Sequence, residues 1–247
     1  MNYFRNIKDY LRMGNTLESH REYVTNLPYD DWLDRTQNIP NLLIKKENFL
    51  DSNDIDLLIN YYYNNQSHLE DNGSIYLMDD FFEKYTNKLI QIANDNGLYD
   101  VEKDTMMISN TENNGGVVIH HDNCKVDNNG NIFKNHTPHR TFTATVSLTD
   151  DFTGGNLFIS KSRNHNNFQE IDEKLGEAIC FTANSDHKHY VSPLKNGRRL
   201  RLLIWLQYKP NLFHFRRIIN LLIFIFVFII IIYIVFIKYL QIFSYRK

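Results

Sequence analysis

The chain has 247 residues and a formal net charge of -2, from 27 Lys and Arg residues against 29 Asp and Glu residues. This balance, with no basic stripe, argues against a nucleic-acid-binding domain, which would carry a dense basic patch. The only two cysteines, Cys124 and Cys180, are too few for a disulfide framework. We expect both to be free thiols, with Cys180 buried in an apolar run.

The N-terminal part of the chain predicts an extension followed by two helices. Residues 1–40 are polar and charged and lack the apolar centre and cleavage site of a secretory signal. We expect an irregular or short-helical extension here and a helical support region at 41–104. Within that region, capping residues precede an amphipathic stretch at 55–62, and Phe81–Ala93 repeats the helical spacing until Gly97 ends it. Both helices should cover the outside of a sheet.

Residues 105–208 are short runs of β-branched and aromatic residues separated by Gly, Asn and Asp, a texture typical of strands. We therefore expect a mainly β domain with flanking helices (α+β), built as a sandwich or a jelly-roll barrel. Residues 125–139 predict a long loop of the kind that acts as a lid, and Gly154-Gly155 predicts a tight turn. The predicted strands are Met106–Ser109, Val117–His120, Thr141–Leu148, Leu157–Ser160, Ala178–Thr182, His189–Ser192 and Leu200–Gln207.

The C-terminal part of the sequence predicts a membrane anchor. A linker at 209–217 leads to residues 218–237, which are apolar apart from Asn220 and Tyr233. About 20 apolar residues in a helix match the roughly 30 Å hydrocarbon core of a bilayer. We therefore expect a single-pass transmembrane helix, followed by a short tail at 238–247.

The position of this span near the end of the chain, without a preceding signal, predicts a C-terminal tail anchor with the main domain in the cytosol. The flanking charges are nearly balanced and do not fix the orientation. Arg216 and Arg217 lie on the domain side, while Lys238, Arg246 and Lys247 lie on the other side. A lumenal domain is the alternative.

The candidate chemistry centres on His120-His121-Asp122. On an extended strand, residues two apart share a face, so His120 and Asp122 can bind one ion while His121 faces away. A distant histidine, either His187 or His189, completes the set. Two imidazoles and one carboxylate on one face of an ion, with other positions open, form the ligand set of non-heme Fe(II) oxygenases.

Several stretches between His120 and Trp205 resemble the prolyl hydroxylases, and most of all the catalytic domain of the prolyl 3-hydroxylases (leprecans). Departures at Thr149 and Asp186-His187-Lys188 remove no ligand and bear on substrate choice. The matching stretches are His120 to Cys124, His139-Arg140-Thr141-Phe142-Thr143-Ala144, Leu148 to Phe158, His189-Tyr190-Val191 and Gly197-Arg198-Arg199.

The resemblance implies a double-stranded β-helix (jelly-roll, cupin-like) barrel and a 2-oxoglutarate-dependent dioxygenase that hydroxylates prolyl residues of a protein or peptide. It implies Fe(II), 2-oxoglutarate and O2 as cofactors, ascorbate as a reductant, and succinate and CO2 as products. His120, Asp122 and His189 would bind the metal.

In this family a basic residue ten positions after the distal histidine binds 2-oxoglutarate. Counting from His189 gives Arg199, whereas counting from His187 gives a glycine. An arginine suits this role because its planar fork pairs with a carboxylate. Arg201 shares the strand face of Arg199 and is the second candidate, whereas Arg198 points the other way, as a solvated charge. Thr143 is a weaker candidate for the cofactor-facing wall.

Two alternatives stay open from the sequence. The same chemistry could act on a lysyl side chain, a nucleobase or a small molecule, although the weak net charge disfavours nucleobases. The chain could instead be an inactive, membrane-tethered binding module, but the intact ligand set and Arg199 count against that reading.

Overall fold

The computed structural model describes residue 21 and residues 24–112, 114–160 and 167–209. The chain divides into one unit at 1–209 and a second at 210–247, and the description below concerns the first. Within the described residues, no helix is both long and apolar enough to cross a membrane. The transmembrane helix predicted at 218–237 lies outside the described residues.

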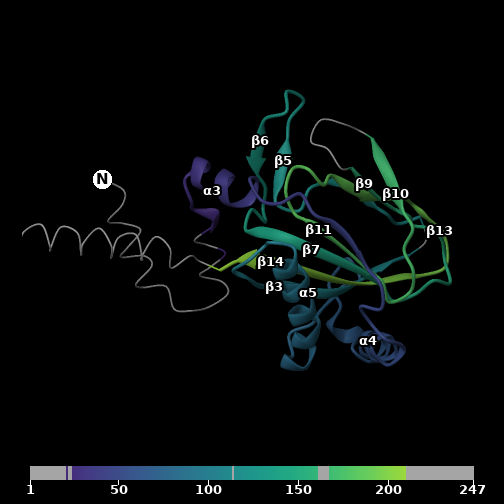
Figure 1. Ribbon diagram of the computed structural model, residues 1–247. Helices are drawn as coiled ribbons and strands as arrows, with labels where there is room; N and C mark the ends of the chain where they lie inside the picture. The colour runs from purple at the N-terminus through teal and green to yellow at the C-terminus, as the bar shows by residue number, and fades with distance from the viewer. Residues whose placement is uncertain (1–20, 22–23, 113, 161–166, 210–247) are drawn as a thin grey trace, which may run out of the picture. The chain divides into compact units, whose positions relative to one another are not determined.

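Two antiparallel β-sheets face each other and form the body of the described domain (Figure 1). The larger sheet has the order β1-β11-β7-β14-β3-β2, and the smaller has the order β10-β9-β12-β4. The larger sheet consists of β1 (Leu43–Lys46), β2 (Ile75–Tyr76), β3 (Val101–Thr111), β7 (Arg140–Ser147), β11 (Ala178–Thr182) and β14 (Arg199–Tyr208). The smaller consists of β4 (Val117–His120), β9 (Leu157–Ser160), β10 (Phe168–Ile171) and β12 (His189–Val191). The predicted mainly β architecture with flanking helices is confirmed.

Two short strand pairs join the ends of these sheets. The first is the hairpin of β5 (Cys124–Val126) and β6 (Ile132–Lys134), directly after the His-x-Asp segment. The second pairs β8 (Thr153–Gly154) with β13 (Leu194–Asn196). Gly154 and Gly155 both have positive φ, at 75° and 66°, as the predicted tight turn requires.

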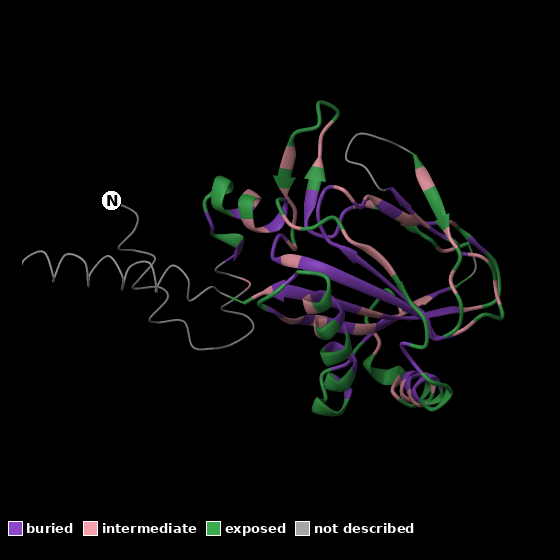
Figure 2. Cartoon of the chain, viewed as in Figure 1, coloured by how far each residue is buried: buried purple, intermediate pink, exposed green. Residues whose placement is uncertain are grey.

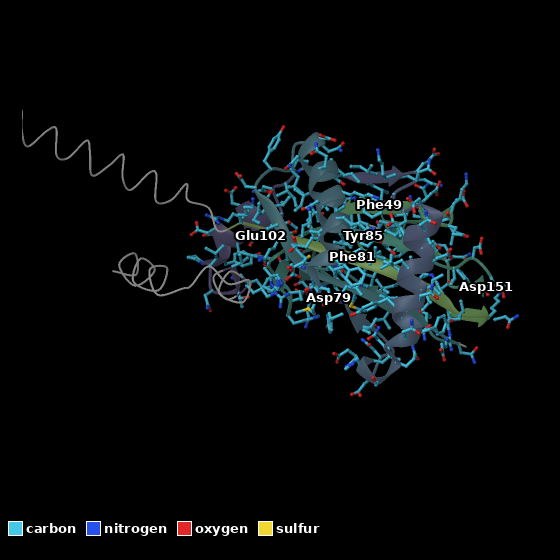
Figure 3. All side chains as sticks on the ribbon, turned by 90° about the horizontal axis from the view of Figure 1, so that it is seen from below. Phe49, Asp79, Phe81, Tyr85, Glu102 and Asp151 are labelled. Atoms are coloured by element: carbon cyan, nitrogen blue, oxygen red, sulfur yellow. The ribbon has the colours of Figure 1, made fainter. Side chains whose placement is uncertain are left out.

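Two helices cover the outer face of the larger sheet, as the amphipathic spacing predicts. They are α4 (Ser52–Asn64) and α5 (Glu83–Asp95), with short 3-10 turns η1 (Gln66–His68) and η2 (Asp80–Phe82) nearby. Asp51 caps α4 by accepting a hydrogen bond from the Asp54 backbone N–H. Gly97, with φ of 84°, follows the end of α5. Figure 3 looks from below onto this layer, where Tyr85 of α5 and Phe49 are labelled.

The main hydrophobic core lies between these helices and the larger sheet. Strand β14 shows the alternation clearly, because Leu200, Leu202, Ile204 and Leu206 enter this core. The next residues along the strand turn to the opposite face, toward the smaller sheet. In Figure 2 the central strands are buried and the outer helix faces are exposed.

A second apolar cluster fills part of the space between the two sheets. It is formed by Leu157, Ile159, Ile179, Phe181 and Val191. Cys180, on the helix side of β11, is buried as predicted, and neither Cys180 nor the buried Cys124 forms a disulfide. The gap between the sheets that this cluster does not fill contains the candidate site.

Two sequence expectations need correction, whereas the irregular or short-helical extension agrees with the described part of residues 1–40. The region 41–104 is more than a helical support, because β1 and β2 join the larger sheet and β3 begins at Val101. The segment 125–139 is not one long loop, because backbone pairing folds much of it into the β5–β6 hairpin. The extension 1–40 contains helix α3 (Tyr29–Thr36), which packs through the buried Trp32 against the same hairpin.

Candidate active site

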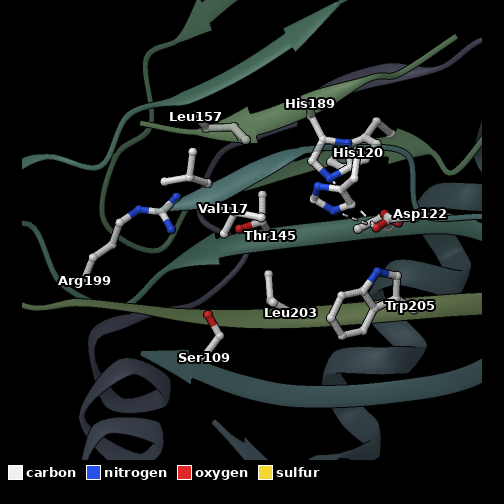
Figure 4. Close-up of a pocket in the computed structure, with 13 residues that line it drawn as sticks. Ser109, Val117, His120, Asp122, Thr145, Leu157, His189, Arg199, Leu203 and Trp205 are labelled. Carbon is white, nitrogen blue, oxygen red and sulfur yellow. Dashed lines mark hydrogen bonds and ion pairs between the residues drawn. The ribbon is translucent and has the colours of Figure 1, made fainter. Parts of the chain in front are cut away.

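His120, Asp122 and His189 converge at one end of the space between the sheets (Figure 4). One ligand atom from each residue lies within 4.8 Å of the other two. Asp122 Oδ1 is 3.6 Å from His120 Nε2 and 3.8 Å from His189 Nε2. These are separations that a single ion could bridge from the centre.

The strand geometry that brings the ligands together differs in one detail from the expectation. Strand β4 ends at His120, and Asp122 lies in the bend that follows, so strand alternation does not align the two. The histidines meet because β4 and β12 are neighbours and His120 and His189 are register partners. The bend then turns the Asp122 carboxylate back toward both rings.

Backbone contacts fix the tautomer of both histidines. The Nδ1 of His120 is 2.8 Å from the Val118 carbonyl oxygen, and the Nδ1 of His189 is 2.9 Å from the His187 carbonyl oxygen. A carbonyl can only accept, so each Nδ1 carries the proton. Each Nε2 is therefore the ring nitrogen that faces Asp122, which is the arrangement that metal-binding histidines need.

Asp122 is buried and ionised. Burial alone raises the pKa of a carboxyl, but His189 and His120 outweigh it and hold the pKa of Asp122 well below its usual range. The hydroxyl of Thr143 donates a 2.5 Å hydrogen bond to Asp122 Oδ2. Oδ1 faces the two imidazoles, so Thr143, proposed from sequence as a cofactor-facing residue, orients the carboxylate and also lines the cavity.

His187, the alternative third ligand, is directed elsewhere. Its Nδ1 lies 3.0 Å from both the carbonyl oxygen and the hydroxyl of Thr182. Among the described residues, the three-residue group able to hold an ion contains His189 and not His187.

A cavity of about 90 Å³ extends from the three ligands to Arg199. In Figure 4 the guanidinium of Arg199 lies at the opposite end from His120, His189 and Asp122, with Val117, Thr145 and Leu203 between them. The complete lining is Ser109, Val117, His120, Asp122, Thr143, Thr145, Leu157, Phe181, His189, Val191, Arg199, Leu203 and Trp205. Both sheets contribute, and the middle of the cavity is largely apolar.

Arg199 and Arg201 share one face of β14, as predicted, and are both buried. They also share one carboxylate, because the Oε2 of Glu173 pairs with the NH2 of Arg201 and lies 3.5 Å from the NH2 of Arg199. Burial and the neighbouring Arg201 lower the pKa of Arg199 to about 9, while Glu173 opposes this shift. Arg199 thus stays cationic at neutral pH, and Arg199, Arg201 and Glu173 together carry one net positive charge.

Only Arg199 of this pair lines the cavity, and its Nε has no hydrogen-bond partner among the described residues. Gly155 makes room for it, because a Cβ there would lie 3.0 Å from Arg199 Cδ. Arg198 points away, as predicted, and its half-exposed side chain pairs with Glu112 at 2.6 Å.

Sequence reasoning missed two residues of this site. Glu173 lies in a charged turn, where a solvated residue is the ordinary expectation, and only the fold brings it to the arginines. Trp205 lines the cavity, and its Nε1 is buried without a hydrogen-bond partner among the described residues. The guanidinium of Arg140 stacks 4.1 Å from the Trp205 ring centroid and fixes the indole from one side. The alternation in β14 that places Arg199 on the cavity side also places Trp205 there.

Comparison with known proteins identifies proteins whose sequences are similar to this chain. Residues 106–207 match the family model described as the 2OG-Fe(II) oxygenase superfamily. Prolyl 3-hydroxylase 3 of Mus musculus is 26% identical over 95 residues, which are 37% of this chain and 13% of that protein. Prolyl 3-hydroxylase 2 of Homo sapiens is 28% identical over 95 residues, again 37% of this chain and 13% of that protein. The chain thus matches only a small part of these relatives.

Solved structures share the fold at low sequence identity. The viral collagen prolyl hydroxylase of Paramecium Bursaria Chlorella virus-1, in its 2OG complex, has a TM-score of 0.53 at 17% identity, covering 68% of this chain and 96% of that one. A prolyl hydroxylase of Trichoplax adhaerens has a TM-score of 0.52 at 16% identity, covering 77% and 91%. The shared fold is the jelly roll of the 2OG oxygenases. Residues 106–207 of this chain therefore resemble the 2OG-Fe(II) oxygenase superfamily in both sequence and fold.

Proposed function

We propose that this chain is an Fe(II)- and 2-oxoglutarate-dependent dioxygenase that hydroxylates prolyl residues of a peptide or protein. One observation carries the proposal. A three-residue ligand face and a buried, unbalanced guanidinium lie at opposite ends of the same cavity. This pattern suits a small dianion with a metal-binding group at one end and a carboxylate at the other.

The donor set fits Fe(II). His120 and His189 offer the Nε2 nitrogens of their imidazoles, and Asp122 offers an ionised carboxylate. When bound, Fe(II) with 2-oxoglutarate and O2 supplies the oxidation, in which one oxygen atom hydroxylates a substrate C–H bond and the other enters succinate as CO2 is released. The fit rests on the tautomers, the burial and the convergence of the three atoms.

The protein side of the reaction is binding and orientation. Arg199 would hold the distal carboxylate of 2-oxoglutarate, because its charge is buried and only partly offset by Glu173. Leu157, Val191 and Leu203 exclude water from the middle of the cavity. Thr143 keeps one oxygen of Asp122 occupied, so that the other faces the metal position.

The prolyl substrate is supported by the similar proteins described above, which are prolyl hydroxylases. The net charge of -2 disfavours a nucleic acid substrate.

The test is hydroxylation of defined peptides by the purified chain. Proline-rich and collagen-like peptides are incubated with Fe(II), 2-oxoglutarate, O2 and ascorbate, the reductant that the family resemblance implies. We expect a mass gain of one oxygen on a prolyl residue, with one succinate per hydroxylation. Succinate release that depends on a lysyl peptide or a small molecule, and not on proline, would replace the prolyl assignment while keeping the reaction class. Absence of metal binding and of succinate would reject the reaction class itself.

We further propose that residues 218–237 anchor this enzyme in a membrane as a single span, with the catalytic domain on the cytosolic side. About 20 apolar residues support the anchor. The flanking charges are nearly balanced and favour neither side, so the cytosolic orientation is the expectation that the glycosylation experiment in the Discussion tests.

A further inference from the structure

We infer that Gln37 is a positioning residue for the metal site, because its side chain connects the loop that carries Asp122 with the loop that leads to His189. Gln37 follows helix α3, upstream of the residues that match the oxygenase family. The inference rests on the proposed metal site and concerns what holds its ligands at the right separation.

The amide of Gln37 makes one contact to each loop. Its Nε2 donates to Asn123 Oδ1 at 3.0 Å, and its Oε1 accepts from the Ser185 backbone N–H at 2.9 Å. Asn123 is the residue directly after Asp122, and Ser185 precedes His189 by four positions. A single side chain therefore spans two segments that are distant in sequence and carry two different ligands.

Both contacts are deeply buried and firmly anchored. Gln37 is 2% exposed, and Asn123 and Ser185 are 0% exposed. Asn123 also donates its Nδ2 to the Arg140 carbonyl oxygen at 2.8 Å. Hydrogen bonds that water cannot replace are costly to lose, so displacement of Gln37 would force both loops to rearrange.

Helix α3 gives Gln37 a fixed position. The indole of Trp32 is fully buried and donates to the Pro138 carbonyl oxygen at 2.8 Å, and the hydroxyl of Tyr29 donates to the Ile132 carbonyl oxygen at 2.6 Å. These contacts fasten the helix to the β5–β6 hairpin and to the segment after it. The N-terminal extension is therefore part of the structure that supports the site.

The separation that Gln37 controls matters for metal binding. Asp122 Oδ1 and His189 Nε2 lie 3.8 Å apart, and metal–ligand distances tolerate only about 0.2 Å of variation. Loss of groups that orient metal ligands typically lowers metal affinity about 10- to 100-fold. We expect Gln37 to fall at the lower end of this range, because Thr143 and the two backbone carbonyls would remain in place.

The experiment measures Mn(II) affinity by calorimetry on the full chain, without turnover. Gln37→Met keeps the length and apolar volume of the side chain and removes its hydrogen bonds to Asn123 and Ser185, together with the 3.3 Å bond from its Nε2 to Thr36 Oγ1. Gln37→Glu keeps the acceptor for Ser185 and removes the donor to Asn123, and it provides the measurement if Gln37→Met does not fold. Asn38→Ala is the matched control, because Asn38 is on the surface and bonds to Asp34 at 3.3 Å. Each titration is run well below the melting temperature of that variant.

We expect Mn(II) binding about 10-fold weaker in Gln37→Met, weaker by a smaller factor in Gln37→Glu, and unchanged in Asn38→Ala. A lower melting temperature with unchanged Mn(II) affinity would reduce Gln37 to a structural residue and overturn the inference. An equal loss of affinity in Asn38→Ala would overturn it as well. If the wild-type chain bound no Mn(II), the proposed function would fail first, and the inference with it.

Discussion

His120 and His189 make the same local hydrogen bond, in which the ring Nδ1–H donates to the backbone carbonyl two residues earlier. The orientation of each ligand therefore depends on backbone and not on the side chains at 118 and 187. This explains why a histidine can stand at 187 without competing for the metal. Its carbonyl orients His189, while its own ring turns to Thr182.

At the ligand positions, His120→Ala, Asp122→Ala and His189→Ala should each abolish 2-oxoglutarate turnover, because the metal loses one of three facial ligands. His187→Ala should retain activity, since only its backbone serves the site. Succinate formation and Mn(II) binding measure both effects. Activity in the His189 variant together with its loss in the His187 variant would reverse the ligand assignment.

Arg199→Ala should raise the KM for 2-oxoglutarate strongly, with a cost of about 2 to 5 kcal/mol, because a buried charge pair loses one partner. Arg198→Ala is the control, since that side chain is half-exposed and pairs with Glu112. Steady-state kinetics over a range of 2-oxoglutarate concentrations measure both. Unchanged cofactor affinity in the Arg199 variant would move the role to Arg201.

The arginines could be found from sequence, but their counter-ion could not. Arg199 is marked by its distance from His189 and by strand alternation, both local properties. Glu173 stands between Asp172 and Lys174, and nothing in that charged turn indicates burial. Gln37 is similar, because nothing in the sequence around this polar residue indicates that its side chain makes buried hydrogen bonds to distant loops. Residues that act through long-range contacts leave no periodic signal.

Among the strands, too, those marked by their local sequence were predicted and those defined by long-range pairing were not. Strands β4, β9 and β11 begin and end where the sequence predicts, because each is a short, mainly apolar run that starts directly after a glycine or a polar residue. Strands β1 and β10 were not predicted, since their sequences Leu-Ile-Lys-Lys and Phe-Gln-Glu-Ile are short and half-polar. Each is the outermost strand of its sheet, where a polar, exposed face is expected.

One buried carboxylate, that of Asp54, connects helices α4 and α5. Asp54 in α4 accepts hydrogen bonds from the Tyr85 hydroxyl at 2.9 Å and from Lys84 Nζ at 2.6 Å, both in α5. Burial alone would raise its pKa, but the bonds from Lys84 and Tyr85 outweigh burial and lower the pKa of Asp54 below 3.8. The stabilisation is therefore present above about pH 4 and is lost as the pH falls through the folded-state pKa.

Asp54→Asn should lower the free energy of unfolding by about 1 to 2 kcal/mol at pH 7. This is less than a fully buried ion pair would contribute, because Lys84 is partly exposed and solvent screens its charge. The difference from wild type should shrink at pH 3, where the wild-type carboxyl begins to protonate. Urea denaturation at both pH values measures it. A difference of the same size at pH 3 would show that the charge of Asp54 is not the cause.

At the scale of the whole molecule, glycosylation can test the proposed cytosolic orientation. Asn-x-Ser/Thr sites occur at Asn65, Asn72 and Asn135, and they are modified only on a lumenal domain. Asn135 is a poor reporter, because its Nδ2 donates to the carbonyls of His121 and Asp122. Asn72 is the useful site, since it is exposed and contacts Ser74 through its oxygen.

In membrane fractions of eukaryotic cells expressing the chain, we expect no glycosidase-sensitive mass and a catalytic domain open to added protease. A glycosylated, protease-protected domain that loses its extra mass in Asn72→Gln would establish the lumenal orientation. The chemistry at His120, Asp122 and His189 would be unaffected by that result.

Strand β14 contributes both to the hydrophobic core and to the proposed active site, which restricts how its sequence can change. Its alternate residues belong to two incompatible environments, the leucine-rich core and the cavity with Arg199 and Trp205. Insertion or deletion of one residue within the strand would exchange the two sets and drive guanidinium groups into hydrocarbon. Changes in the cavity lining that keep the fold must therefore arise by replacement of individual side chains, because a change of one residue in the length of β14 would exchange its two faces.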